Sequence, residues 1–115
     1  MLYVLFEAIV KPECSDEYLK IAAGLNKALQ EIPGFIRSER FTSLKDERKL
    51  LSLSVWEDEA SIERWRNVLE HRRAQQHGRE YAFLRYTITV TSAIRCYTDT
   101  LREEAPEDSK AFFEK

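Results

Sequence analysis

The chain has 115 residues, with 18 basic and 20 acidic side chains and a formal charge of −2. Its length allows one domain, and 43% apolar residues are enough for one core. A basic tract and a run of ~20 apolar residues are both absent from the sequence, so we expect neither nucleic acid nor a membrane as a partner. The opening residues lack the marks of a secretion signal, and we expect a soluble, cytoplasmic protein.

The cysteines give no sign of a metal site. Cys14 and Cys96 are far apart and belong neither to a C-x-x-C pair nor to a His/Cys cluster. We therefore expect two ordinary side chains, without a structural disulfide or bound metal.

The first predicted elements are a strand over residues 2–10 and a helix that runs from Ser15 to about residue 31. LYVLFEAIV is almost entirely apolar, as is typical of a central strand covered on both faces. Ser15 can cap the helix, whose apolar side chains recur at helical spacing. Pro33-Gly34 ends it.

Residues 35–56 predict a β-hairpin with a polar turn at 44–49. Period two from Phe35 places Arg37, Glu39 and Phe41 on one side of the first strand, with Ile36, Ser38, Arg40 and Thr42 on the other. In the second strand, 50–56, we assign Leu51, Leu53 and Val55 to the core. The opposite face is small and hydroxylated and ends in Trp56.

The last third of the sequence predicts a helix, a strand and a charged tail. Asp58 can cap the helix, and residues 86–97 alternate as a strand does. The tail, 98–115, carries two phenylalanines near its end. It is either a disordered terminus or an arm that docks on a partner subunit.

The predicted order is β-α-β-β-α-β, which favours a ferredoxin-like α+β fold. Its four-stranded antiparallel sheet has the strand order 4-1-3-2, with both helices on one face. The other face would be uncovered in a single chain, so we expect a homodimer with two packed sheets.

Four stretches of the sequence resemble the antibiotic biosynthesis monooxygenase family. They are PGF at 33–35, SERF at 38–41, LLSLSVWEDEASIERWR at 50–66, and H-x-x-A-Q-x-x-G-R at 71–79, followed by Tyr86 and a last strand. The likeness covers a domain of residues 1–97 and leaves the tail, 98–115, outside it. It implies a ferredoxin-like protomer, a dimeric α+β barrel and a pocket between sheet and helices.

The resemblance also implies an activity. Several members of the family are cofactor-free oxygenases, so the expected function is a cofactor-independent monooxygenase acting on a small aromatic or quinol-type molecule. A second branch degrades haem and carries an Asn on the first strand, a Trp on the second helix and an iron-binding His. Here Trp65 matches, Phe6 stands at the Asn position and Gln75 lies near the His position. Haem degradation is the alternative, and a ligand-binding dimer without catalysis is a third hypothesis.

Two residues are the predicted catalytic pair. His71 suits a general base because an imidazole titrates near neutral pH, and Trp65 can form an aromatic wall with an N–H donor. The competing interpretations are a solvent-facing histidine and a core indole. On a regular helix the two lie about 120° apart, so a shared pocket requires a kink near Asn67 or a pocket that wraps the helix.

The predicted substrate-binding residues share aromatic or hydrogen-bonding side chains. They are Phe6, Phe41, Gln75, Arg79, Phe83 and Tyr86. Core packing is the simpler account of the aromatic ones. Arg40 and Arg79 are candidates to pair with a substrate anion, with a solvated or ion-paired arginine as the alternative.

Overall fold

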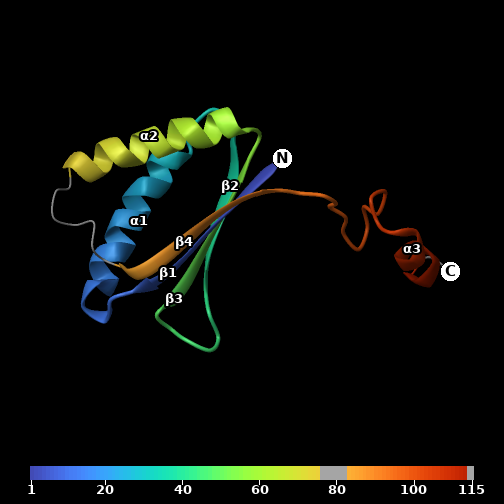
Figure 1. The fold of residues 1–115 in the computed structure, drawn as a ribbon, viewed down its shortest axis with the longest axis horizontal. Helices are drawn as coiled ribbons and strands as arrows, with labels where there is room; N and C mark the ends of the chain where they lie inside the picture. Colours follow the sequence, from blue (N-terminus) through green and yellow to red (C-terminus); the bar gives the residue numbers. More distant parts are fainter. Residues whose placement is uncertain (76–82, 114–115) are drawn as a thin grey trace.

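The computed structural model describes residues 1–75 and 83–113. Within these ranges the side chains at 14, 15, 17, 21, 70–75, 83, 84 and 111–113 are not described. The elements in chain order are β1 (Leu2–Val10), the 3-10 turn η1 (Pro12–Cys14), α1 (Ser15–Leu29), β2 (Phe35–Thr42), β3 (Lys49–Trp56), α2 (Glu59–Gln75), β4 (Phe83–Ser92) and α3 (Glu107–Phe113). Figure 1 shows α1 and α2 on one side of the sheet and α3 at the end of an arm.

The four strands form one antiparallel sheet in the order β2-β3-β1-β4. This order confirms the predicted ferredoxin-like arrangement. The two most apolar strands, β1 and β3, are central, because a central strand is covered by neighbours and can carry apolar residues on both faces. β4 ends at Ser92, five residues before the predicted end at Tyr97.

β2 contains an irregularity at its start. Phe35 lies opposite Trp56, and Arg37 lies opposite Val55, so the register shifts at Ile36. The rings of Phe35 and Trp56 meet edge-on, with centroids 5.3 Å apart. A bulge of this kind moves the following side chains to the other face of the strand. The period-two prediction was therefore wrong at Phe35, which does not share a side with Arg37.

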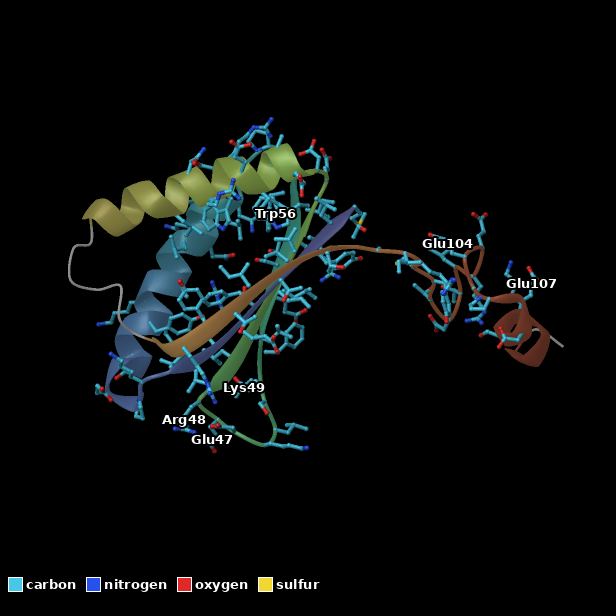
Figure 2. All side chains as sticks on the ribbon, viewed as in Figure 1. Glu47, Arg48, Lys49, Trp56, Glu104 and Glu107 are labelled. Carbon is cyan, nitrogen blue, oxygen red and sulfur yellow. The ribbon has the colours of Figure 1, made fainter. Side chains whose placement is uncertain are left out.

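One side of the sheet faces the helices. Arg40 of β2 donates from Nη2 to the carbonyl oxygen of Ala22 in α1, at 3.2 Å. Trp56 lies under the N-terminal part of α2 (Figure 2) and is 1% exposed. Both residues are on the hydroxylated side of β3, with Ser52 and Ser54. We call this the helix side and the other the open side.

The assignment of the core on β3 needs correction. Leu51, Leu53 and Val55 were predicted to form the core face, but they lie on the open side. Val55 is nevertheless buried, while the two leucines remain partly exposed. The pattern of apolar residues alone pointed to the wrong side, because the helix side of β3 is lined by serines.

The helix α2 is capped by Asp58, as predicted. Its carboxylate accepts hydrogen bonds from the hydroxyl of Ser61 at 2.6 Å and from the Ser61 backbone N–H at 2.9 Å. These bonds, first that from the hydroxyl, hold the pKa of Asp58 below its usual value. The cap fixes the point at which the chain turns from β3 into α2.

The turn before β2 lies against this cap. Gly34 has φ of 92°, in the left-handed region that favours glycine. Its carbonyl oxygen accepts a hydrogen bond from the backbone N–H of Glu57 at 2.8 Å. The beginnings of β2 and α2, distant in sequence, are thus joined.

The chain after β4 extends away from the sheet (Figure 1). The radius of gyration is 17.3 Å, against about 13 Å for a compact domain of this length. This C-terminal arm has its own structure. Arg102 donates to the Thr98 carbonyl at 3.0 Å and to the Ser109 hydroxyl at 2.9 Å, and its guanidinium lies over the Tyr97 ring. Ala105, in the same arm, is buried, whereas Ile94 is 89% exposed.

Candidate functional site

The helix side of the sheet is the candidate site. One residue from each strand forms a row across it, in the order Arg40, Ser52, Phe6 and Ile88. The row begins with a cation on β2, passes a hydroxyl on β3 and ends with apolar side chains on β1 and β4. It offers an ionic end and an apolar end to one bound molecule.

The two adjacent rows repeat this gradient. They consist of Ser38, Ser54, Val4 and Val90 on one side, and of Thr42, Leu50, Ala8 and Tyr86 on the other. The β2–β3 half is mostly hydroxylated, and the β1–β4 half is apolar. An amphipathic ligand therefore has one favoured orientation on the surface.

The apolar half is not closed by the helices. Tyr86, Ile88 and Val90 are 51%, 57% and 48% exposed, although they are on the side that faces α1 and α2. The rings of Phe6 and Tyr86 are tilted by 33° with centroids 5.6 Å apart. Exposed aromatic and β-branched side chains next to a covered core are typical of a surface that receives an apolar ligand.

Trp65 of α2 lies on the helical stripe that faces the sheet. It is partly exposed, as are Ile62 and Leu69, which lie three positions before and four positions after it. Trp56, by contrast, is fully enclosed, and its indole N–H donates to the hydroxyl of Ser54 at 2.8 Å. The structural role predicted for Trp56 agrees with this burial, and Trp65 is the more exposed of the two tryptophans.

The position of His71 is set by an unbroken helix. α2 continues from Glu59 to Gln75 without the kink near Asn67 that a shared pocket required. The backbone at 71 is therefore about 120° around the helix from Trp65, in line with the exposed residues Arg64 and Asn67. A pocket that holds both catalytic candidates would have to wrap α2.

The remaining predicted site residues divide into three groups. Phe6 and Tyr86 are in contact on the helix side. Phe41 is on the open side, 42% exposed, beside a hollow that Glu7, Lys49 and Leu51 also line, so the structure does not bring it together with Phe6. The side chains of His71, Gln75 and Phe83 and all of Arg79 lie outside the described residues.

The charges of the sheet are sorted by side. Arg40 is the one charged residue among the helix-side positions in the described strands. The open side carries the others: Glu7, Arg37, Glu39, Lys49 and Arg85. Ser52 and Ser54 were not singled out from the sequence as site residues. The feature of the sequence that could have identified them is the small, hydroxylated face of the strand at 50–56.

The described residues hold neither a metal-binding cluster nor a membrane-crossing helix. No group of three or more His, Cys, Asp and Glu side chains is placed to hold an ion in that part of the chain. None of its helices is both long and apolar enough to span a bilayer.

Solved structures with the same fold include an oxygenase and a protein with a bound metalloporphyrin. SnoaB from Streptomyces nogalater, a cofactor-independent oxygenase, is 16% identical with a TM-score of 0.66, over 83% of this chain and 94% of its own. MhuD, with two manganese protoporphyrin IX molecules bound per active site, is 15% identical with a TM-score of 0.69, over 85% and 99%. At such identities the similarity shows the fold alone.

Sequence comparison identifies the family. A jasmonate monooxygenase of Pyricularia oryzae is 40% identical over 98 residues, which cover 83% of this chain and 46% of that protein. The chain thus spans about half the length of this relative. The family profile described as antibiotic biosynthesis monooxygenase matches residues 1–77, from β1 through α2. The chain belongs to the antibiotic biosynthesis monooxygenase family.

Proposed function

We propose that the protein is a monooxygenase that works without a resident cofactor on a small, electron-rich apolar molecule, of aromatic or quinol type. The observation that carries the proposal is the 40% identity to a named monooxygenase. The exposed apolar half of the helix side supports it, because it offers a binding surface for such a substrate.

The reaction needs little from the protein. A base removes a proton from an activated CH₂ group, and the resulting anion reacts with O₂. The CH₂ becomes C=O, one oxygen atom enters the product, and the other leaves as water with the two hydrogens. The substrate supplies all four electrons. The protein holds the anion, positions the base and keeps water away.

We assign these tasks to the predicted residues. Phe6 and Tyr86 are assigned to the floor of the apolar surface, and Trp65 of α2 to an aromatic wall whose N–H donates to the substrate oxygen. His71 is the proposed base, because imidazole accepts a proton near neutral pH. Gln75, Arg79 and Phe83 follow it in sequence and complete the proposed binding set. Phe41, on the open side, is assigned to a contact between subunits.

We further propose that a second copy covers the open side. Five apolar residues there are partly exposed: Tyr3, Leu5, Ile9, Leu51 and Leu53. Acidic and basic residues alternate around them, which suits a surface that pairs with its own copy. Burial of roughly 1,000 Å² or more would make such a dimer stable.

The test is oxygen consumption by the purified protein with naphthols, hydroquinones, anthrones and jasmonate, followed by mass analysis of products made under ¹⁸O₂. We expect uptake with at least one compound and one labelled oxygen in the product. Trp65→Phe and His71→Ala should each lower the rate at least about tenfold, whereas Arg66→Ala, an exposed site on α2, should not.

The outcome separates the hypotheses. Binding of the same compounds without oxygen uptake would replace the oxygenase with a ligand-binding dimer. Activity that survives both Trp65→Phe and His71→Ala would move the catalytic site away from α2.

A further inference from the structure

Among the described strand residues, the helix side of the sheet carries a single cation, Arg40, at its polar edge. The guanidinium of Arg40 is fixed there by its hydrogen bond to the Ala22 carbonyl. No carboxylate among the described residues forms an ion pair with it. Every other charged residue of the described strands projects from the opposite side. Arg40 is exposed, so a ligand can reach its guanidinium, and its side of the sheet sets it apart from the other charged residues of the strands.

We propose that Arg40 and Ser52 form an anion subsite for the carboxylate of an amphipathic acid, whose apolar part lies on Phe6 and Ile88. The inference rests on the proposed function, since it names the class of substrate for the same surface. A guanidinium presents paired N–H donors that match a carboxylate, and the neighbouring hydroxyl can donate a further bond.

The spacing of the row sets the length of the ligand. Neighbouring strands are ~4.8 Å apart, so Arg40 on β2 and Phe6 on β1 are separated by about 10 Å. A ring on Phe6 therefore requires a carboxylate on a short side chain of several carbons. Ser52 lies between the two, opposite both of them in the register.

The alternative occupants fit less well. A phosphate would bring two charges to one arginine. An aromatic or quinol-type molecule without a carboxylate would leave Arg40 without a counter-charge when the ligand excludes water from the helix side, which is unfavourable for a cation. A monocarboxylate supplies one charge for one charge and places the remaining atoms on the apolar half.

Binding, measured by calorimetry, tests the subsite without any reliance on turnover. The probes are 1-naphthylacetic, 3-(1-naphthyl)propionic and 4-(1-naphthyl)butyric acid, each with its methyl ester. We expect the propionic or butyric acid to bind roughly tenfold or more tightly than its ester, as for a hydrogen bond to a charged group. Arg40→Gln should remove that preference and leave the affinity for the ester unchanged, and Arg40→Lys should restore part of it.

Two matched variants complete the design. Arg37→Gln removes a charge from the same strand but from the open side, and it should leave the acid-to-ester ratio unchanged. Ser52→Ala should reduce the ratio less than Arg40→Gln does. Circular dichroism and the midpoint of thermal unfolding establish that each variant is folded.

The proposal is overturned if none of the three acids binds at millimolar concentration, if acid and ester bind equally, or if Arg37→Gln lowers the ratio as much as Arg40→Gln. Its failure is distinct from failure of the oxygenase. Oxygen uptake by a protein that binds each acid and its ester equally refutes the subsite alone. Arg40-dependent acid binding without oxygen uptake refutes the oxygenase alone.

Discussion

Gly34 and Ser61 pack so closely that a methyl group on residue 34 would overlap the Ser61 side chain. Ser61 cannot move aside easily, because it is 1% exposed and its hydroxyl is held by Asp58. The positive φ of Gly34 adds a second restriction on any side chain at this position. The contact joins the start of β2 to the start of α2 and so fixes how the helix sits over the site.

Gly34→Ala should therefore lower the free energy of unfolding by about 1–3 kcal/mol, through strain and displacement of Ser61. Gly24 supplies the control, since it lies in α1 with no neighbouring atom near an added methyl group. Gly24→Ala should raise the same quantity by about 0.5–1 kcal/mol, because alanine is the better helix former. Urea unfolding measures the free energy of unfolding of both variants. Equal changes in the two would contradict the close packing of Gly34 against Ser61.

The Asp58 cap predicts how stability depends on pH. Hydrogen bonds from Ser61 lower the pKa of the folded carboxyl, so its stabilising effect is present above the unfolded value near 3.8 and is lost as pH falls through the folded value. Urea midpoints should fall below about pH 4. Asp58→Asn keeps a capping side chain and should flatten that fall.

Asp46 is a second carboxylate whose pKa is lowered in the folded protein, and it can be compared with Asp58. Hydrogen bonds from Arg48 lower its pKa in the turn between β2 and β3, where Glu47, Arg48 and Lys49 are labelled in Figure 2. This pair is exposed, and salt should screen its charge interaction. Each Asp→Asn variant should differ from the wild type in how far its urea midpoint falls with pH. In 0.5 M salt this difference should be retained more fully for Asp58→Asn than for Asp46→Asn. A fall with pH that is identical in both variants and the wild type would contradict the assignment.

Haem binding can be tested by titration of the protein with haemin. With Phe6 in place of an Asn on β1, we expect no sharp Soret band of a ligated haem. His71→Ala is informative in either case. A sharp band in the wild type that this variant lacks would establish His71 as an iron ligand and the haem-degrading alternative as the correct one.

Sedimentation velocity at micromolar concentration should show a dimer. Leu53 lies near the centre of the open side, between Leu5 and Glu39. Leu53→Asp should shift the protein to the monomer, because it places a charge in the proposed apolar contact. Glu63→Gln, on the exposed face of α2, should have no effect. A wild-type monomer would refute the contact.

Removal of residues 98–115 tests the arm separately. The buried Ala105 and the Arg102 contacts belong to the arm and not to the sheet, so the shortened chain should keep its far-ultraviolet spectrum apart from the loss of α3. A weaker dimer after truncation would support docking on the partner subunit. An unchanged dimer would exclude that role.

Much of the fold was predictable, because it depends on periodicity and on strong local signals. The apolar runs of β1 and β3, the cap at Asp58 and the break at Pro33-Gly34 indicated the order and placement of the six elements from β1 to β4. The helix α3, in the tail, was not predicted. The sides of the strands were harder to predict. The leucines of β3 indicated a core on the side that the helices do not cover, and the serines on the helix side gave no hydrophobic signal.

The candidate site was predicted in part. Phe6 and Tyr86, both predicted binding residues, are in ring contact, and Arg40 was among the candidates to pair with an anion. Period two places Phe41 and Arg40, adjacent in the chain, on opposite sides of the strand, but sequence spacing could not reveal which of the two would lie under the helices. The spacing did show that His71 and Trp65 can share a pocket only if the helix is kinked near Asn67 or the pocket wraps around it. Because α2 is continuous, only the wrapping pocket remains.

The bulge at Ile36 has a consequence for how this surface could change. Ile36 is the extra residue of the bulge, so its deletion would leave Arg37 opposite Val55 and Arg40 opposite Ser52. If Ile36 instead paired with Val55, every later side chain would move by one position, and Arg37, Glu39 and Phe41 would face the helices in place of Ser38, Arg40 and Thr42. The bulge, and not the composition of the strand, therefore decides which of these charges lie under the helices.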